Sequence, residues 1–160
     1  MSQASLTLPS IGLGTAGLGN LYQPVTDEQA EALLVAAWQA GIRYFDTAPF
    51  YGLGRAEARL GRFLANIPDP AMVSTKVGRV LDPVLVEDVP EVGFADPLPF
   101  SPRFDYSRDG ILRSVEDSVR RLGRMPDILL IHDIGRQAHG EVGNATHLSD
   151  LRASGFRALE

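Results

Sequence analysis

The chain has 160 residues, no cysteine and a formal net charge of −5, with 44% hydrophobic and 22% charged residues. This length suffices for one domain with a buried core, and the lack of cysteine excludes disulfides, thiolate metal sites and a cysteine nucleophile. We expect a cytoplasmic protein without nucleic-acid or membrane partners, because the chain is acidic, has no apolar run near the ~20 residues of a membrane span, and lacks a signal-peptide pattern.

Strands and helices alternate along the chain, a pattern typical of a parallel sheet. We predict strands over residues 10–15, 42–46, 72–76 and 127–132. Helices are predicted from Thr26 to about Gly41, from about Ala56 to Leu64, and from about Ser107 to Gly123. The first helix begins at Thr26. Thr26 and Gln29 have the spacing of a capping box. The last strand has an apolar centre, Ile128 to Ile131, which predicts a strand buried on both faces.

Residues 77–106 form a long stretch without a convincing helical or strand period. Its prolines are Pro83, Pro90, Pro97, Pro99 and Pro102. Nothing in this stretch marks a domain boundary. We interpret it as a Pro-rich loop inserted into one domain, with a functional role.

The segment from Gly12 to Gly17 fits the dinucleotide pattern G-x-G-x-x-G. In a Rossmann unit these glycines join a buried strand directly to a helix that holds a pyrophosphate. Here the next predicted helix begins only at Thr26, after Pro24. The context therefore favours a glycine-rich strand end, with a Rossmann-type dehydrogenase as the alternative.

Each later strand ends in a titratable residue: Asp46, Lys76 and His132, with Tyr51 in the loop after Asp46. Carboxyl ends of parallel strands share one edge, so the four side chains can meet. A lysine cation favours the phenolate form of a tyrosine, an aspartate orients the lysine, and a histidine can hydrogen-bond a carbonyl or hydroxyl oxygen. This set suits proton transfer coupled to hydride transfer. Taken alone, each of these residues is more often a solvated or hydrogen-bonded side chain than a catalytic one.

A metal site is the other use of residues near His132. The candidate ligands would be His132, Asp133, His139 and Glu141. Their spacing matches no standard ligand pattern, and we place them in or beside a loop. We therefore expect no metal.

The chain resembles the aldo-keto reductases in four segments. They are Gly12-Leu-Gly-Thr15, Phe45-Asp-Thr-Ala-Pro-Phe-Tyr-Gly52, Ser74-Thr-Lys-Val77 and Asp127-Ile-Leu-Leu-Ile-His132. The resemblance implies Tyr51 as general acid/base, Lys76 and Asp46 as its tuning partners, and His132 as the residue that orients the substrate. It also implies NAD or NADP at the mouth of a barrel, with Gly14, Thr15 and Asp46 near the nicotinamide.

A narrower resemblance is to the sugar 1-dehydrogenase branch of this family. It rests on Phe104-Asp-Tyr-Ser107, His132-Asp-Ile-Gly135 and His139-Gly140. The implied reaction is oxidation of an aldose hemiacetal, such as L-fucose or L-galactose, to a lactone. A pyridoxal 4-dehydrogenase is a close alternative, and the substrate in every case is a small molecule.

The resemblance further implies an α/β fold, the N-terminal half of a (β/α)8 TIM barrel. Residues 1–160 would be a single partial barrel domain with four parallel strands and about three and a half helices. The fourth helix would begin at residues 155–160 and be truncated. A barrel of eight units needs ~250 residues, so we expect the chain to need a missing C-terminal half-barrel or a pairing partner. A non-catalytic remnant or interaction fragment is the alternative.

Overall fold

The computed structural model describes residues 7–160, and its centre is a sheet of four parallel strands. The strands are β1 (Leu13–Gly14), β2 (Tyr44–Asp46), β3 (Met72–Val77) and β6 (Ile128–Ile131), in the order β1-β2-β3-β6. Asp46 pairs with Ser74, and Lys76 pairs with Leu130. The predicted partial barrel with four parallel strands is therefore confirmed, and its longest strand, β3, lies inside the sheet.

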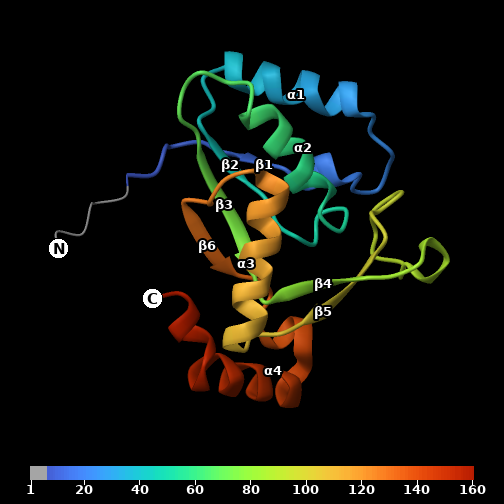
Figure 1. Cartoon of the computed structure of the whole chain (residues 1–160), viewed down its shortest axis with the longest axis vertical. Coiled ribbons are helices and arrows are strands. Elements are labelled where there is room, and N and C mark those ends of the chain that lie inside the picture. The colour runs from blue at the N-terminus through green and yellow to red at the C-terminus, as the bar shows by residue number, and fades with distance from the viewer. Residues whose placement is uncertain (1–6) are drawn as a thin grey trace.

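The first three helices follow the sequence prediction closely. They are α1 (Asp27–Gln39), α2 (Arg55–Leu64) and α3 (Arg108–Leu122). Thr26 and Gln29 form the predicted capping box. Ser107 caps α3 at its start, and Gly123 ends it in the left-handed conformation (φ 71°) that glycine adopts without strain. Figure 1 shows α1 at the top of the molecule, α2 below it and α3 below α2.

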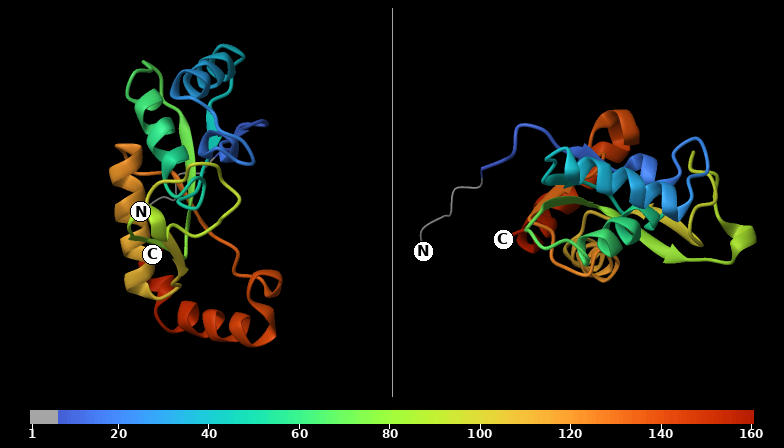
Figure 2. Two further views of the ribbon diagram at one scale, coloured as in Figure 1. Left: turned by 90° about the vertical axis from the view of Figure 1, so that its right-hand side faces the viewer. Right: turned by 90° about the horizontal axis from the view of Figure 1, so that it is seen from above.

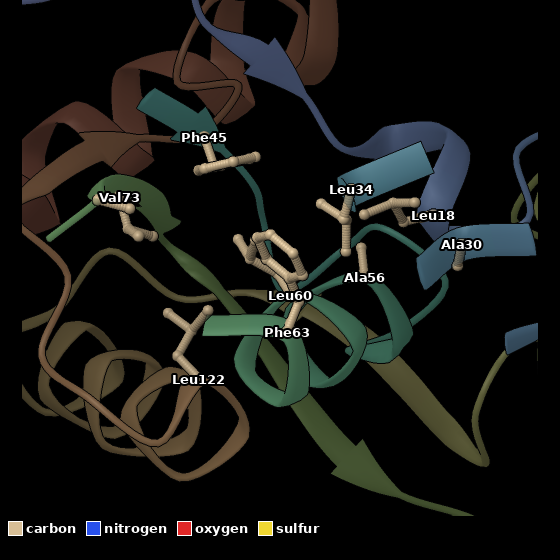
Figure 3. Packing of buried hydrophobic residues seen from close by; sticks show 10 residues of the cluster. Leu18, Ala30, Leu34, Phe45, Ala56, Leu60, Phe63, Val73 and Leu122 are labelled. Carbon is tan, nitrogen blue, oxygen red and sulfur yellow. The ribbon is translucent and has the colours of Figure 1, made fainter. Parts of the chain in front are cut away.

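One face of the sheet is packed against these helices. Because side chains alternate along a strand, Phe45, Val73, Thr75 and Val77 point to this face, and all have 0% exposure. Figure 3 shows Phe45 and Val73 gathered with Leu34 of α1 and Phe63 of α2. Phe45 stacks on Trp38 at 6.5 Å and meets Phe63 edge-on at 6.1 Å, measured between ring centroids. This cluster is the main core.

The opposite face of the sheet is more open. It carries the half-buried Tyr44, Asp46 and Lys76, the fully buried Ser74 between them, and at the edge strand Leu130, whose exposure is 41%. The prediction that the centre of β6 is buried on both faces is therefore wrong for residues 7–160. The helices cover only one side of this strand, and Leu130 on its other side is left partly exposed.

The Pro-rich stretch contains regular structure that we did not predict. β4 (Arg79–Pro83) and β5 (Phe100–Phe104) form an antiparallel ribbon, with a 3-10 turn, η2 (Val86–Asp88), in the loop between them. Proline is compatible with strands that pair on one side only, because its missing N–H then costs no ladder bond. The expectation of an irregular loop is thus wrong at both ends of this segment. Figure 2 shows the ribbon extending away from the sheet.

The last helix also differs from the prediction. α4 (Arg136–Ala153) covers residues for which we predicted no helix, and it begins where we placed His139 and Glu141 in or beside a loop; it bends at Gly140 (φ 65°). Gly140 and Gly143 weaken the helical pattern in the sequence, because glycine disfavours helix interiors. Residues 155–160, where we predicted the start of the fourth helix, hold only a 3-10 turn, η3 (Gly155–Ala158). α4 lies at the end of the molecule opposite α1 (Figure 1).

Candidate active site

Three strands deliver their predicted site residues to one edge of the sheet. Asp46 ends β2, Lys76 lies one residue before the end of β3, and His132 follows β6 directly. The His132 N–H donates to the carbonyl of Val77 at 2.9 Å, which continues the ladder past β6. All three side chains therefore lie at the carboxyl end of a parallel sheet, where ligands bind in such folds.

Asp46 and Lys76 form an ion pair at this edge. The Lys76 Nζ donates to Asp46 Oδ2 at 2.7 Å and to the Thr47 carbonyl at 2.8 Å. Ser74 donates from Oγ to Asp46 Oδ1 at 2.6 Å, and its hydroxyl contacts the Tyr44 hydroxyl at 2.9 Å. Both carboxylate oxygens thus have donors, and two of the three ammonium protons are committed. The pair is rigidly held on the open face.

Tyr51 is held beside this pair by a close backbone contact. A side chain at Gly19 would overlap the backbone of Tyr51, and one at Gly52 would overlap Gly19. These two glycines let the turn before α2 lie directly on the short 3-10 turn η1 (Ala16–Gly19). The Lys76 Nζ lies 4.7 Å from the centroid of the Tyr51 ring. Its cation therefore faces the ring, and within residues 7–160 the Tyr51 hydroxyl makes no hydrogen bond.

His132 completes the group from the far side. Its ring centroid lies 6.3 Å from that of Tyr51, with the rings nearly perpendicular at 89°. Burial, helped by the cations of Arg79 and Lys76, lowers the pKa of His132 to about 4. The imidazole is therefore neutral at pH 7. Its Nδ1 is buried without a hydrogen-bond partner among the described residues. A neutral imidazole can hydrogen-bond a substrate oxygen.

Two residues near His132 were missed by the sequence analysis as site residues. The hydroxyl of the buried Tyr106 donates to the His132 carbonyl at 2.6 Å, and burial raises its pKa. The guanidinium of Arg79 lies 3.9 Å from the Phe50 ring centroid and pairs with Asp133 at 2.5 Å. Tyr106 lies in a segment that we singled out only for its resemblance. Arg79 carries no sequence signal, because it lies in the stretch that we took as irregular.

The predicted nicotinamide contacts differ in how accessible they are. Gly14 is exposed, and a Cβ built on it would meet no atom within 4 Å, so a flat ring fits against its backbone beside Asp46. Thr15 is buried, and its hydroxyl donates to the Asp46 carbonyl at 3.0 Å. Thr15 thus fastens the end of β1 to β2. Asp46, paired with Gly14 across β1 and β2, supplies a polar side chain beside it. The open backbone and these polar groups fit the nicotinamide end of NAD(P).

The Rossmann alternative does not agree with the structure. β1 lies inside the glycine segment, and η1 follows it before α1 begins at Asp27. A pyrophosphate therefore meets no α-helix N-terminus directly after these glycines, as that motif requires.

The metal alternative and a membrane span also lack support in residues 7–160. In this part of the chain, no three or more His, Asp or Glu side chains converge as metal ligands. Glu141 instead pairs with Arg136 at 3.2 Å. None of the helices described combines the length and apolar character needed to cross a bilayer.

Comparison with known proteins gives consistent matches over nearly the whole chain. The sequence profile of the Aldo/keto reductase family matches residues 10–158. Pyridoxal 4-dehydrogenase of Microbacterium luteolum is 44% identical, over 99% of this chain and 49% of that protein. D-threo-aldose 1-dehydrogenase of a Pseudomonas species is 43% identical, over 98% and 47%. The chain spans about half the length of these relatives.

A solved structure agrees with these sequence matches. The aldo-keto reductase from Klebsiella pneumoniae in complex with NADPH superimposes with a TM-score of 0.56 at 25% identity. The superposition covers 91% of this chain and 42% of that structure. The fold of the chain is therefore that of a part of such a barrel.

Proposed function

The chain belongs to the aldo/keto reductase family, and from this premise we propose that it supplies the acid/base site of an NAD(P)-dependent oxidoreductase. The observation that carries the proposal is the convergence of Tyr51, the Lys76–Asp46 pair and His132 at one edge of the sheet. No other described edge of the molecule combines a tyrosine, a paired lysine and a desolvated histidine.

Tyr51 is the proposed proton carrier. Its hydroxyl is unengaged within the described residues, and the Lys76 ammonium lies 4.7 Å from the ring centroid. In oxidation the Tyr51 oxygen takes the proton of the substrate hydroxyl, and in reduction it returns a proton to the carbonyl oxygen. Lys76 presents its positive charge to the Tyr51 ring, and Asp46 orients the lysine by their ion pair. Tyr51, Lys76 and Asp46 therefore act as one unit.

His132 is the proposed orienting residue. A neutral imidazole can hydrogen-bond the reacting oxygen without competing for its proton, since the pKa of His132 is about 4. Gly14 and Asp46 would border the nicotinamide, and Thr15 would hold the strand end on which they lie. The chemistry that NAD(P) supplies when bound is transfer of hydride to or from the substrate carbon. We expect the residues that hold the cofactor phosphates, and the preference for NAD or NADP, outside this chain.

An aldose hemiacetal is the proposed substrate, with oxidation to a lactone. The second candidate is pyridoxal. Its support is the aromatic surface beside the site, where Phe94 lies 6.3 Å from Tyr51 and 5.6 Å from Phe50 between ring centroids. Flat rings pack well on such a surface. The two relatives cited above are named for substrates of these two kinds and are nearly equally similar.

We also propose that further βα units cover the open face of the sheet. The support is the exposure of Leu130 at 41%, two unpaired strand edges at β1 and β6, and relatives of about twice the length. Exposed apolar side chains and bare strand edges invite association. Without such a cover the chain would be a non-catalytic fragment.

The test uses Tyr51→Phe in the intact protein. We expect NAD(P)H formation from L-fucose, L-galactose or pyridoxal to fall by a factor of about 10² to 10⁴. Tyr22→Phe is the matched control, because Tyr22 has 87% exposure and belongs to no part of the site. Both variants should melt like the parent protein. Turnover by Tyr51→Phe within a few fold of the parent would contradict the assignment.

A further inference from the structure

Arg79 occupies an unusual position at the start of β4. Its guanidinium carbon lies 3.9 Å from the Phe50 ring centroid and 4.3 Å from that of Phe104, so two aromatic rings hold it. Its side chain is only 14% exposed, and its Nε is buried without an acceptor in residues 7–160. A desolvated guanidinium normally uses its donors fully. Held between these rings, the guanidinium has little freedom to move.

Asp133 is the acidic partner of Arg79 and lies next to His132. Arg79 Nη2 donates to Asp133 Oδ2 at 2.5 Å, and the same oxygen lies 3.5 Å from His132 Nε2. The Asp133 backbone has φ 50°, a left-handed conformation that aspartate and asparagine tolerate best among residues with side chains. Its side chain is 43% exposed and lines a hollow with Gly135, Gln137 and Ala138. The carboxylate is thus fixed on one side and open on the other.

We propose that Arg79 and Asp133 form a hydroxyl-recognition subsite that selects polyhydroxylated substrates. The inference rests on the proposed function and deepens it. Asp133 accepts the hydrogen bond of the hydroxyl on the carbon next to the reacting one. Arg79 fixes the carboxylate through its ion pair, so that the open side of Asp133 faces the substrate.

The geometry supports a sugar over a substrate without neighbouring hydroxyls. In the proposed function His132 contacts the reacting oxygen of the substrate. Asp133 Oδ2 lies 3.5 Å from His132 Nε2, so Asp133 would meet the hydroxyl on the next carbon. The ion pair is close to neutral, so it does not select a charged ligand. Polar groups that lose water and find no partner penalise an analogue that lacks the hydroxyl. The subsite therefore separates an aldose from its deoxy analogue.

The test compares Asp133→Asn with the parent in the intact protein, using L-fucose and 2-deoxy-L-fucose with NAD(P). Asparagine keeps the size and the left-handed backbone of Asp133 but removes its charge. We expect kcat/KM for L-fucose to fall roughly 10- to 100-fold, and kcat/KM for the deoxy sugar to fall less than about threefold. Asp82→Asn is the matched control, because Asp82 pairs with Arg103 at 2.7 Å on the same ribbon outside the site.

Two outcomes overturn the subsite: equal losses for both sugars, which would mean that Asp133 acts only through His132, or no loss for either. Calorimetric titration with the two sugars gives the same discrimination without turnover. Failure of the proposed function shows separately, as Tyr51→Phe with normal turnover. Asp133→Asn should leave the pH profile for 2-deoxy-L-fucose near pH 7 unchanged, because His132 is neutral there in both proteins.

Discussion

The helix-covered face of the sheet and its open face are built from the same strands, but only the first is packed against helices. Phe45 and Asp46 are consecutive, as are Thr75 and Lys76, yet the first of each pair is fully buried against helices and the second belongs to the candidate site. The period of two residues in a strand makes this division. Stability is thus concentrated on one face and chemistry on the other, and substitutions can test the two separately.

The largest stability effect is expected on the covered face, from Phe45→Ala. This change removes a ring that contacts Trp38 and Phe63, and we expect a loss of about 3–5 kcal/mol in the free energy of unfolding, measured with urea. Leu33→Ala on α1 is the control, because Leu33 is 49% exposed and should cost less than about 1 kcal/mol.

Leu130→Gln extends this comparison to the open face. If further βα units cover Leu130 in the intact protein, as we propose, the cost should approach roughly 2–3 kcal/mol. A cost near that of the Leu33 control would mean that the open face remains in water, and the proposed cover would then be wrong.

A second covered-face prediction concerns Glu57, which is fully buried. Arg121 of α3 donates to Glu57 Oε2 at 2.7 Å, and Thr75 of β3 donates to Oε1 at 2.5 Å, so this carboxylate ties two helices to the sheet. Arg121→Met leaves the charge of Glu57 unpaired and should cost about 3 kcal/mol, measured by urea unfolding. Arg120→Met removes the neighbouring exposed arginine and should cost less than about 1 kcal/mol. Equal costs would contradict the structural role of Glu57.

The smallest predicted effect is a pH dependence from the open face. The pKa of His132 is about 4 in the folded protein against an ordinary value of 6.5, so the unfolded chain binds more protons between these values. Stability from neutral His132 is therefore fully present above pH 6.5 and is lost as the pH falls toward 4. We expect a loss of about 2 kcal/mol between pH 7 and pH 5.

His132→Gln should remove most of this slope, measured by urea unfolding at several pH values. The comparison is made in a His139→Gln background, because burial also lowers the pKa of His139 and contributes with the same sign. An unchanged slope would mean that His132 is hydrated and that the open face does not desolvate its histidine.

The site predicted from sequence shows what local patterns can locate. Asp46, Lys76 and His132 were predicted from their places at strand ends, and the structure brings them together with Tyr51. Their catalytic roles stay predictions. The contact between the Lys76 cation and the Tyr51 ring was not predictable, because it depends on how the loop after β2 packs on Gly19.

The sequence by itself determined the features that depend on residues within one or two turns. Examples are the capping box at Thr26, the glycine stop at Gly123, and the alternation that separates Phe45 from Asp46. These follow from backbone hydrogen bonding and strand geometry, which act locally.

Only the tertiary structure decided the contacts between distant segments. Arg79 and Asp133 are separated by 54 positions, and Glu57 and Arg121 by 64. The β4–β5 ribbon and α4 also depend on packing, since their prolines and glycines oppose the local pattern. Such pairings gain their energy from burial and from charges desolvated together, which exist only after the chain has brought these segments into contact.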